Sequence, residues 1–265
     1  MARLTHWEGE PIAVWAELWD LNGALGEVPP TFEVHDELGS TSDRLREMAE
    51  QGAGSFSVVI AESQSAGRGR RGAVWHSPSG SGLWMSVLLP ARSPSVSYLP
   101  LLVGLATARA VDNSVPGAGA GLEWPNDVIV RGTKVAGVLC EAGEGGRVVA
   151  GIGVNVRTPP GGFAPDIAER AGSLEALLGC SVSRASLANE VLRGLRRLVA
   201  ARLGNALPEP LLDDLNRRDV LAGRRVRTEQ EGRGTARGIA QRGALVLERP
   251  DGSRVHVVAG SVGLE

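Results

Sequence analysis

Residues 127–156 read DVIVRGTKVAGVLCEAGEGGRVVAGIGVNV, and this stretch decides the fold that we predict. It contains runs rich in valine, isoleucine and leucine, separated by glycine-containing turns, at residues 127–130, 135–141 and 147–156. Short runs of such residues bounded by turn residues are typical of β-strands. We therefore predict that these runs are strands of one β-sheet.

The chain around this stretch alternates between strand-like and helix-like patterns. Further strands are predicted at residues 32–35, 57–61 and 83–89, and helices at about 40–51, 97–113 and 187–202. The last helix has apolar residues at helical spacing and arginines on its other face, so we expect it to dock on the surface of the body. This order predicts an α+β fold, a mixed β-sheet with helices on one side.

The two ends of the chain differ from the middle. The first residues contain Trp7, Trp15 and Trp19, the last two on one helical face, and predict a short helix packed on the body. Short strand-like runs near the other end, separated by glycine-containing turns, predict a small β-barrel. The predicted units are an N-terminal extension (1–30), a main domain (31–218) and the barrel (219–265).

Composition excludes several classes of protein. The chain has 28 basic and 30 acidic side chains, so we expect no nucleic-acid partner. Cys140 and Cys180 are too few for a disulfide framework and share no metal-ligand spacing with the four histidines, which fits a reducing cytoplasm. No apolar run is long enough to span a bilayer, so we expect neither export nor a membrane partner.

A loop rich in glycine and arginine carries the densest functional signal. Residues 61–78 read AESQSAGRGRRGAVWHSP. Glycines let the backbone approach a ligand, and the arginines supply charge for phosphate or carboxylate oxygens. An exposed flexible loop is the alternative, but Trp75 offers a ring ligand a stacking surface and favours a binding loop. The loop is neither a Walker motif nor a dinucleotide fingerprint, and the chain has no serine-hydrolase elbow.

A second constellation lies in the quoted stretch and just before it. Residues 123–127 read EWPND, and a turn at Asn126-Asp127 would place an amide beside a carboxylate, suited to a ribose, a phosphate or Mg²⁺. An ordinary turn is the alternative. Lys134 is the only lysine among the 28 cationic side chains, the others being arginine. A lysine kept in such a chain suggests a site that needs a compact ammonium, although arginine bias alone could leave one surface lysine.

Taken together, these motifs resemble those of the biotin protein ligases. The matching stretches, in order, are Gly39-Ser40-Thr41-Ser42, residues 64–72 with Trp75 and residues 77–80, residues 124–127, Lys134 to Leu139 and Gly151 to Asn155. The resemblance implies a class II synthetase-like catalytic domain followed by an SH3-like barrel. It also implies an enzyme that activates biotin with ATP to biotinoyl-5′-AMP. A second step would then transfer biotin to a lysine of a biotin carboxyl carrier protein.

The resemblance also assigns roles to residues. Biotin contacts would be Ser40, Thr41, Ser42, Gln64, Arg68, Gly69, Arg70 and Lys134, and ATP contacts Arg68, Arg70, Trp75, Asn126, Asp127 and Asn155. Catalysis would rest on Lys134, Arg70 and Asp127, because fixed cations let a carboxylate approach a triphosphate. Asp127 would either bind Mg²⁺ or help deprotonate the incoming lysine; the sequence leaves this open.

The chain departs from the family at three positions in these motifs. Glu123 stands where the family usually has lysine, Ala73 where it often has arginine, and Ser42 where it has asparagine. A lipoate or octanoate ligase, a biotin-sensing regulator with a DNA-binding domain, and a non-catalytic biotin-binding module are the alternatives. Gln64 with Ser40-Thr41 favours biotin, and we expect a monomer or homodimer.

Overall fold

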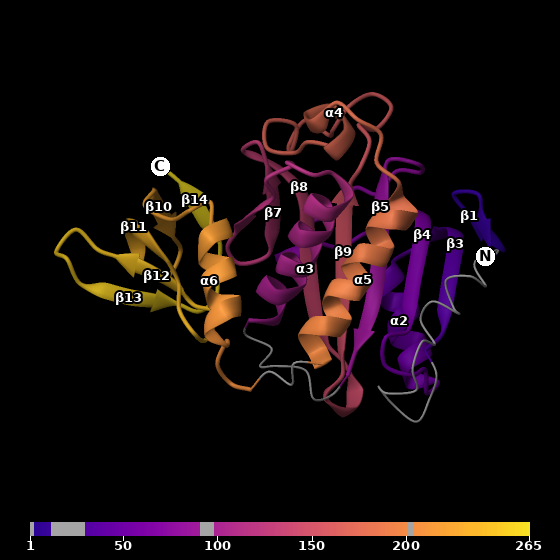
Figure 1. The fold of residues 1–265 in the computed structure, drawn as a ribbon, viewed down its shortest axis with the longest axis horizontal. Coiled ribbons are helices and arrows are strands. Elements are labelled where there is room, and N and C mark those ends of the chain that lie inside the picture. The colour runs from indigo at the N-terminus through magenta and orange to yellow at the C-terminus, as the bar shows by residue number, and fades with distance from the viewer. Residues whose placement is uncertain (1–2, 12–29, 91–97, 201–203) are drawn as a thin grey trace.

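The computed structural model describes residues 3–11, 30–90, 98–200 and 204–265 (Figure 1). Its centre is a seven-stranded sheet in the order β3-β4-β5-β9-β8-β7-β6. The strands are β3 (Phe32–Leu38), β4 (Val58–Gln64), β5 (Gly82–Leu89), β9 (Val148–Asn155), β8 (Thr133–Ala142), β7 (Asp127–Val130) and β6 (Gly121–Glu123). Only β3 and β4 among these neighbours pair in parallel, so the predicted mixed sheet is confirmed.

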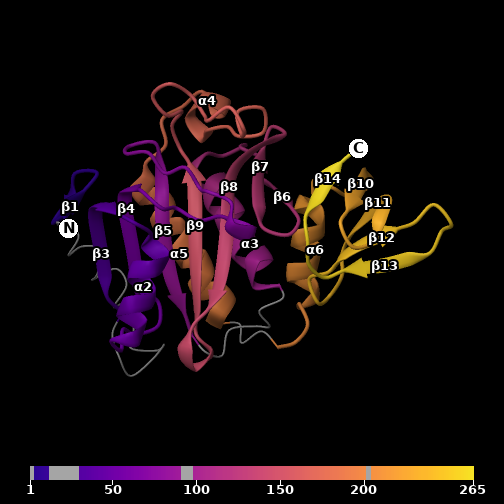
Figure 2. The ribbon, with the colours of Figure 1, turned by 180° about the vertical axis from the view of Figure 1, so that it is seen from behind.

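Helices cover both faces of this sheet because β4 and its neighbours bury alternate residues on opposite sides. Val58 and Ile60 belong to the core beneath α3 (Leu99–Ser114) and α5 (Arg184–Ala200), while Val59 and Ala61 pack under α2 (Thr41–Glu50). Figure 2 shows α2 on the face opposite α3 and α5. The prediction of helices on one side therefore holds for the two long helices, and the ten-residue α2 lies on the other face.

A smaller antiparallel sheet follows the large one at the β6 edge (Figure 1). Its order is β13 (Arg254–Val257), β12 (Leu245–Glu248), β11 (Gly232–Ile239), β10 (Arg225–Thr228) and β14 (Val262–Leu264). β13 and β14 are its outer strands, so closure into a barrel stays a prediction. α6 (Glu209–Arg218) contacts both β6 and β11, and the predicted division after residue 218 likewise stays a prediction.

The first described residues form a hairpin where we expected a helix. β1 (His6–Trp7) pairs with β2 (Glu10–Pro11), and Trp7 is buried against the body. Most of the predicted helix, including Trp15 and Trp19, lies outside the described residues. None of the helices in the described ranges has the length and apolarity needed to cross a bilayer.

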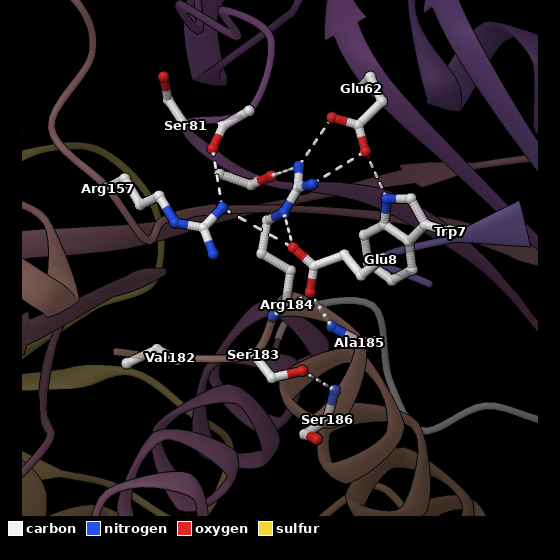
Figure 3. A network of polar contacts seen from close by, with 12 residues as sticks. Trp7, Glu8, Glu62, Ser81, Arg157, Val182, Ser183, Arg184, Ala185 and Ser186 are labelled. Carbon is white, nitrogen blue, oxygen red and sulfur yellow. Dashed lines mark hydrogen bonds and ion pairs between the residues drawn. The ribbon is translucent and has the colours of Figure 1, made fainter. Parts of the chain in front are cut away.

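Arg184, at the start of α5, ties the hairpin to the large sheet (Figure 3). Its guanidinium lies 2.6 Å from Glu8 Oε1 and donates two hydrogen bonds to the Glu62 carboxylate, at 2.9 and 3.0 Å. Trp7 Nε1 also donates to Glu62, at 2.5 Å. Burial alone would raise the pKa of Glu8, but the hydrogen bond and charge of Arg184 outweigh it and lower that pKa. The network joins the hairpin, β4 and α5.

We expect Arg184→Met to destabilise the protein by about 3–5 kcal/mol, because it leaves two carboxylates without their buried partner. Urea unfolding near neutral pH measures this. Arg193→Met is the matched control, since Arg193 forms an exposed pair with Glu190 and its loss should cost at most about 1 kcal/mol. The stability that Glu8 contributes through Arg184 is fully present above the usual carboxyl pKa and is lost as the pH falls through the lowered pKa of Glu8. The difference in unfolding free energy between the parent and Arg184→Met should therefore shrink in acid. Equal losses for both variants would contradict this role.

Candidate active site

One cavity of about 1060 Å³ gathers every residue that the sequence predicts for the site. Its predicted lining residues are Ser40, Thr41, Ser42, Gln64, Arg68, Gly69, Arg70, Trp75, Asn126, Asp127, Lys134 and Asn155. The cavity is also lined by the segment after β9, residues 157–171 in part, and by Ser261 and Val262 of the small sheet. Our sequence reasoning missed these, because their approach depends only on tertiary packing.

The parallel pairing of β3 and β4 builds one end of the cavity. Leu38 pairs with Gln64, so the carboxyl ends of both strands meet there, and α2 begins immediately beyond β3 with Ser40 as its N-cap. Gln64 Oε1 accepts from the backbone N–H of Thr41 at 2.9 Å and from its hydroxyl at 3.1 Å. This end therefore presents hydroxyl and amide groups.

The glycine- and arginine-rich loop spans the cavity and is anchored on both sides. Arg68 donates to Asp43 at 2.5 Å and to Glu141 at 3.2 Å, and the Asp43 hydrogen bond is the main reason that its pKa is raised. Arg70 donates to Asn126 Oδ1 at 3.0 Å and to the carbonyl of Gly260 at 2.9 Å. Burial lowers the pKa of Arg70, so this guanidinium has lost part of its hydration while its hydrogen-bond acceptors here are neutral.

The Trp75 indole packs against two glycines of the sheet. Gly137 and Gly153 pair across β8 and β9, and a β-carbon on either would come within 2.8 or 2.3 Å of the indole. The ring meets Trp84 edge to face at a centroid distance of 6.5 Å, and Lys134 Nζ lies 5.4 Å from its centroid. Trp75 Nε1 faces Gly153 and is buried without a hydrogen-bond partner among the described residues.

Lys134 Nζ lies 2.6 Å from Asp127 Oδ2 across the β7–β8 hairpin and forms an ion pair with it. The other carboxylate oxygen, Asp127 Oδ1, is buried without a hydrogen-bond partner among the described residues. The described residues contain no group of three acidic, histidine or cysteine side chains that could hold a metal alone. One carboxylate with a free oxygen fits Mg²⁺ only in the way Mg²⁺ binds beside nucleotides, through one or two carboxylates plus the phosphates.

Beside Lys134, the carboxyl groups of Glu123, Asp127 and Asp219 lie near one another and form what we call the acidic corner. Burial, and then the charge of Asp127, raises the pKa of Glu123. Burial and the nearby Glu123 likewise raise the pKa of Asp219 to about 6, against the backbone hydrogen bond from Leu221. Arg170, 3.5 Å from Glu123, is a mostly exposed cation at this corner. Asp219 and Arg170 had no sequence signal, since neither lies in a motif.

Comparison with known proteins agrees with this geometry. Residues 37–157 match the model of the Biotin/lipoate A/B protein ligase family, and residues 222–264 match that of the biotin protein ligase C terminal domain. The biotin–[acetyl-CoA-carboxylase] ligase of Mycobacterium tuberculosis is 38% identical over 87% of this chain and 88% of its own length. The bifunctional ligase/repressor BirA of Bacillus subtilis is 32% identical over 82% of this chain and 69% of its own.

Solved structures give the same result. The biotin protein ligase of Aquifex aeolicus in complex with biotin and ATP aligns with a TM-score of 0.75 and 26% identity, over 89% of this chain and 98% of that one. The ligase of Leishmania major in complex with biotinyl-5-AMP aligns with a TM-score of 0.62 and 26% identity, over 87% and 100%. From its sequence and its fold, this chain belongs to the biotin protein ligases of the biotin/lipoate A/B protein ligase family.

Proposed function

We propose that this protein is an ATP-dependent biotin protein ligase that works in two steps. The biotin carboxylate attacks the α-phosphorus of ATP, forming biotinoyl-5′-AMP and releasing pyrophosphate. The amine of a carrier lysine then attacks the acyl carbonyl, forms the amide and releases AMP. The observation that carries the proposal is one cavity lined by hydroxyl and amide side chains, by the Trp75 indole and by the cations Lys134, Arg68 and Arg70.

The first step brings the biotin carboxylate close to the phosphates of ATP, and the cations of the cavity offset the repulsion between these anions. Arg70 is partly buried and hydrogen-bonds only to neutral acceptors, so a phosphate oxygen would give it the ionic partner it lacks. Lys134 is the compact charge that can lie between carboxylate and phosphate, once it exchanges Asp127 for the substrates. Both would stabilise charge that grows in the transition state.

Asp127 has a proposed use in each step. Its carboxylate would accept a proton from the carrier lysine, which must be uncharged to attack the anhydride. When ATP is bound, Asp127 with the phosphates would hold Mg²⁺, which neutralises phosphate charge. Asn126 and Asn155 line the same region and would contact the nucleotide, with Trp75 stacking on its base.

The polar end of the cavity favours biotin over a lipoyl or octanoyl chain. Thr41, Ser42 and Gln64 line the cavity and offer a ureido ring further hydrogen-bond acceptors, whereas an acyl tail would cover these polar groups without bonding to them. For the second substrate we propose the biotin carboxyl carrier domain of a biotin-dependent carboxylase, in the cytoplasm. We further propose that the enzyme acts as a monomer or homodimer without nucleic acid.

The direct test is biotin-dependent exchange of labelled pyrophosphate into ATP by the purified protein with Mg²⁺. Exchange should require biotin, and lipoate or octanoate should neither replace nor compete with it. Transfer to a purified carrier domain, followed by mass spectrometry, tests the second step. Absence of biotin-dependent exchange from a folded protein would refute the proposed function.

Replacing the lone lysine should slow the first step. We expect Lys134→Arg to lower kcat for adenylate formation about 10²-fold, because a planar guanidinium cannot take the place of a compact ammonium between two oxyanions. Arg131→Lys, an arginine-lysine exchange in the turn of the same hairpin, should change kcat by less than about twofold. Full activity of Lys134→Arg would show that only its charge matters.

Replacing Glu123 should help ATP binding. Its carboxylate repels phosphates and adds to the acidic corner, so Glu123→Lys should lower KM for ATP about two- to fivefold and Glu123→Gln should lie between that variant and the parent. Steady-state pyrophosphate exchange gives both constants. An unchanged or higher KM for ATP in both variants would mean that Glu123 lies away from the phosphates.

A further inference from the structure

Ser86 lies behind the hydroxyl end of the cavity and is fully buried on β5. It does not line the cavity, yet its Oγ is 2.8 Å from Thr41 Oγ1 and 3.0 Å from Ser42 Oγ, both of which belong to lining residues. Any effect of Ser86 on a ligand must therefore pass through these two hydroxyls.

The direction of each hydrogen bond in this cluster follows from the number of protons available. The backbone N–H of Thr41 can only donate, so the atom of Gln64 facing it must be the amide oxygen. That oxygen can only accept, so the Thr41 hydroxyl donates its single proton to it. Thr41 must then accept from Ser86, and Ser86, its own proton used, must accept from Ser42.

The same reasoning fixes the other side of Gln64. Its amide nitrogen donates to Ser77 Oγ at 2.8 Å, and the Ser77 hydroxyl donates to the carbonyl of Trp75 at 3.1 Å. The hydrogen bonds thus run one way, from Ser42 through Ser86, Thr41, Gln64 and Ser77 to Trp75. Such a chain holds each group in one orientation, because reversing one bond would leave a donor facing a donor.

We propose that Ser86 is a positioning residue that fixes the Thr41 and Ser42 hydroxyls as hydrogen-bond acceptors toward the ligand. With their protons directed into the protein, only lone pairs of these hydroxyls face the cavity, so this end selects a ring that presents N–H donors. The inference rests on the proposed function, in which the ureido ring of biotin supplies those N–H groups. Ser42, at the position where the family has asparagine, keeps a donor toward Ser86.

Kinetics of Ser86→Ala separate this role from simple packing. We expect KM for biotin to rise about tenfold, with kcat and KM for ATP changed less than about twofold, because the Ser42 hydroxyl loses its acceptor and can turn, and the Thr41 hydroxyl loses its donor. Ser42→Ala should give a similar rise, and the double variant no more than either single one, since both break the same chain. Ser57→Ala is the matched control: Ser57 is equally buried and hydrogen-bonded, but to the backbone of Thr31 and Gly54. It should lower the melting temperature without changing KM for biotin.

A biotin analogue with oxygen in place of one ureido N–H gives the sharper test. The parent should discriminate against it by at least about tenfold in kcat/KM, and Ser86→Ala should discriminate less, because a freed hydroxyl can donate to the new acceptor. An unchanged KM for biotin and unchanged discrimination in Ser86→Ala would overturn the role of Ser86. If the parent protein is active in the same assay, the proposed ligase function would still stand. A parent that forms no adenylate would overturn the proposed function itself. Additive effects in the double variant would also contradict the chain.

Discussion

The parallel pairing of β3 with β4 is the constraint on which the site depends. Because these two strands run the same way, the residues that follow them leave the same edge of the sheet, and Thr41 meets the side chain of Gln64. The antiparallel neighbours then return the chain to this edge, which brings Asn155 at the end of β9 to the cavity. Asp127, at the start of β7, lines the same cavity from further inside the sheet, level with Gly137 and Gly153. The Arg184 network holds the same region from outside, through Glu62 two residues before Gln64.

Local patterns predicted most of this architecture. The strand runs, the helices predicted at about residues 40–51, 97–113 and 187–202, and the cavity residues that belong to motifs were visible as periodicity or motif. Elements that form only through contacts with other segments of the chain were not visible in the sequence. β6 has three residues and exists through its pairing with β7, and the hairpin of Trp7 depends on Glu62 and Arg184, far along the chain.

The interactions that tune the site were also beyond sequence reasoning. Arg68 reaches Glu141 across 73 positions, and Arg70 reaches Gly260 across 190, so no local signal connects them. The sequence identified Glu123 as a departure, but only the fold shows that it lies near Asp219, whose pKa is raised by burial and then by the charge of Glu123. Ser86 looked like one residue of an apolar strand until its neighbours on α2 were in place.

The ion pairing of Lys134 affects whether the enzyme's own lysine can react with the acyl-adenylate intermediate. A mixed anhydride of biotin and AMP reacts with free amines, but the Lys134 ammonium has no lone pair with which to attack while it is paired with Asp127, at 2.6 Å, or with the oxyanions of bound substrates. The other cationic side chains of the chain are guanidinium groups, which stay protonated and are poor nucleophiles. A cavity built with arginine around one ion-paired lysine can therefore keep an amine-reactive compound next to positive charge and still leave the amine of the carrier as the favoured acceptor.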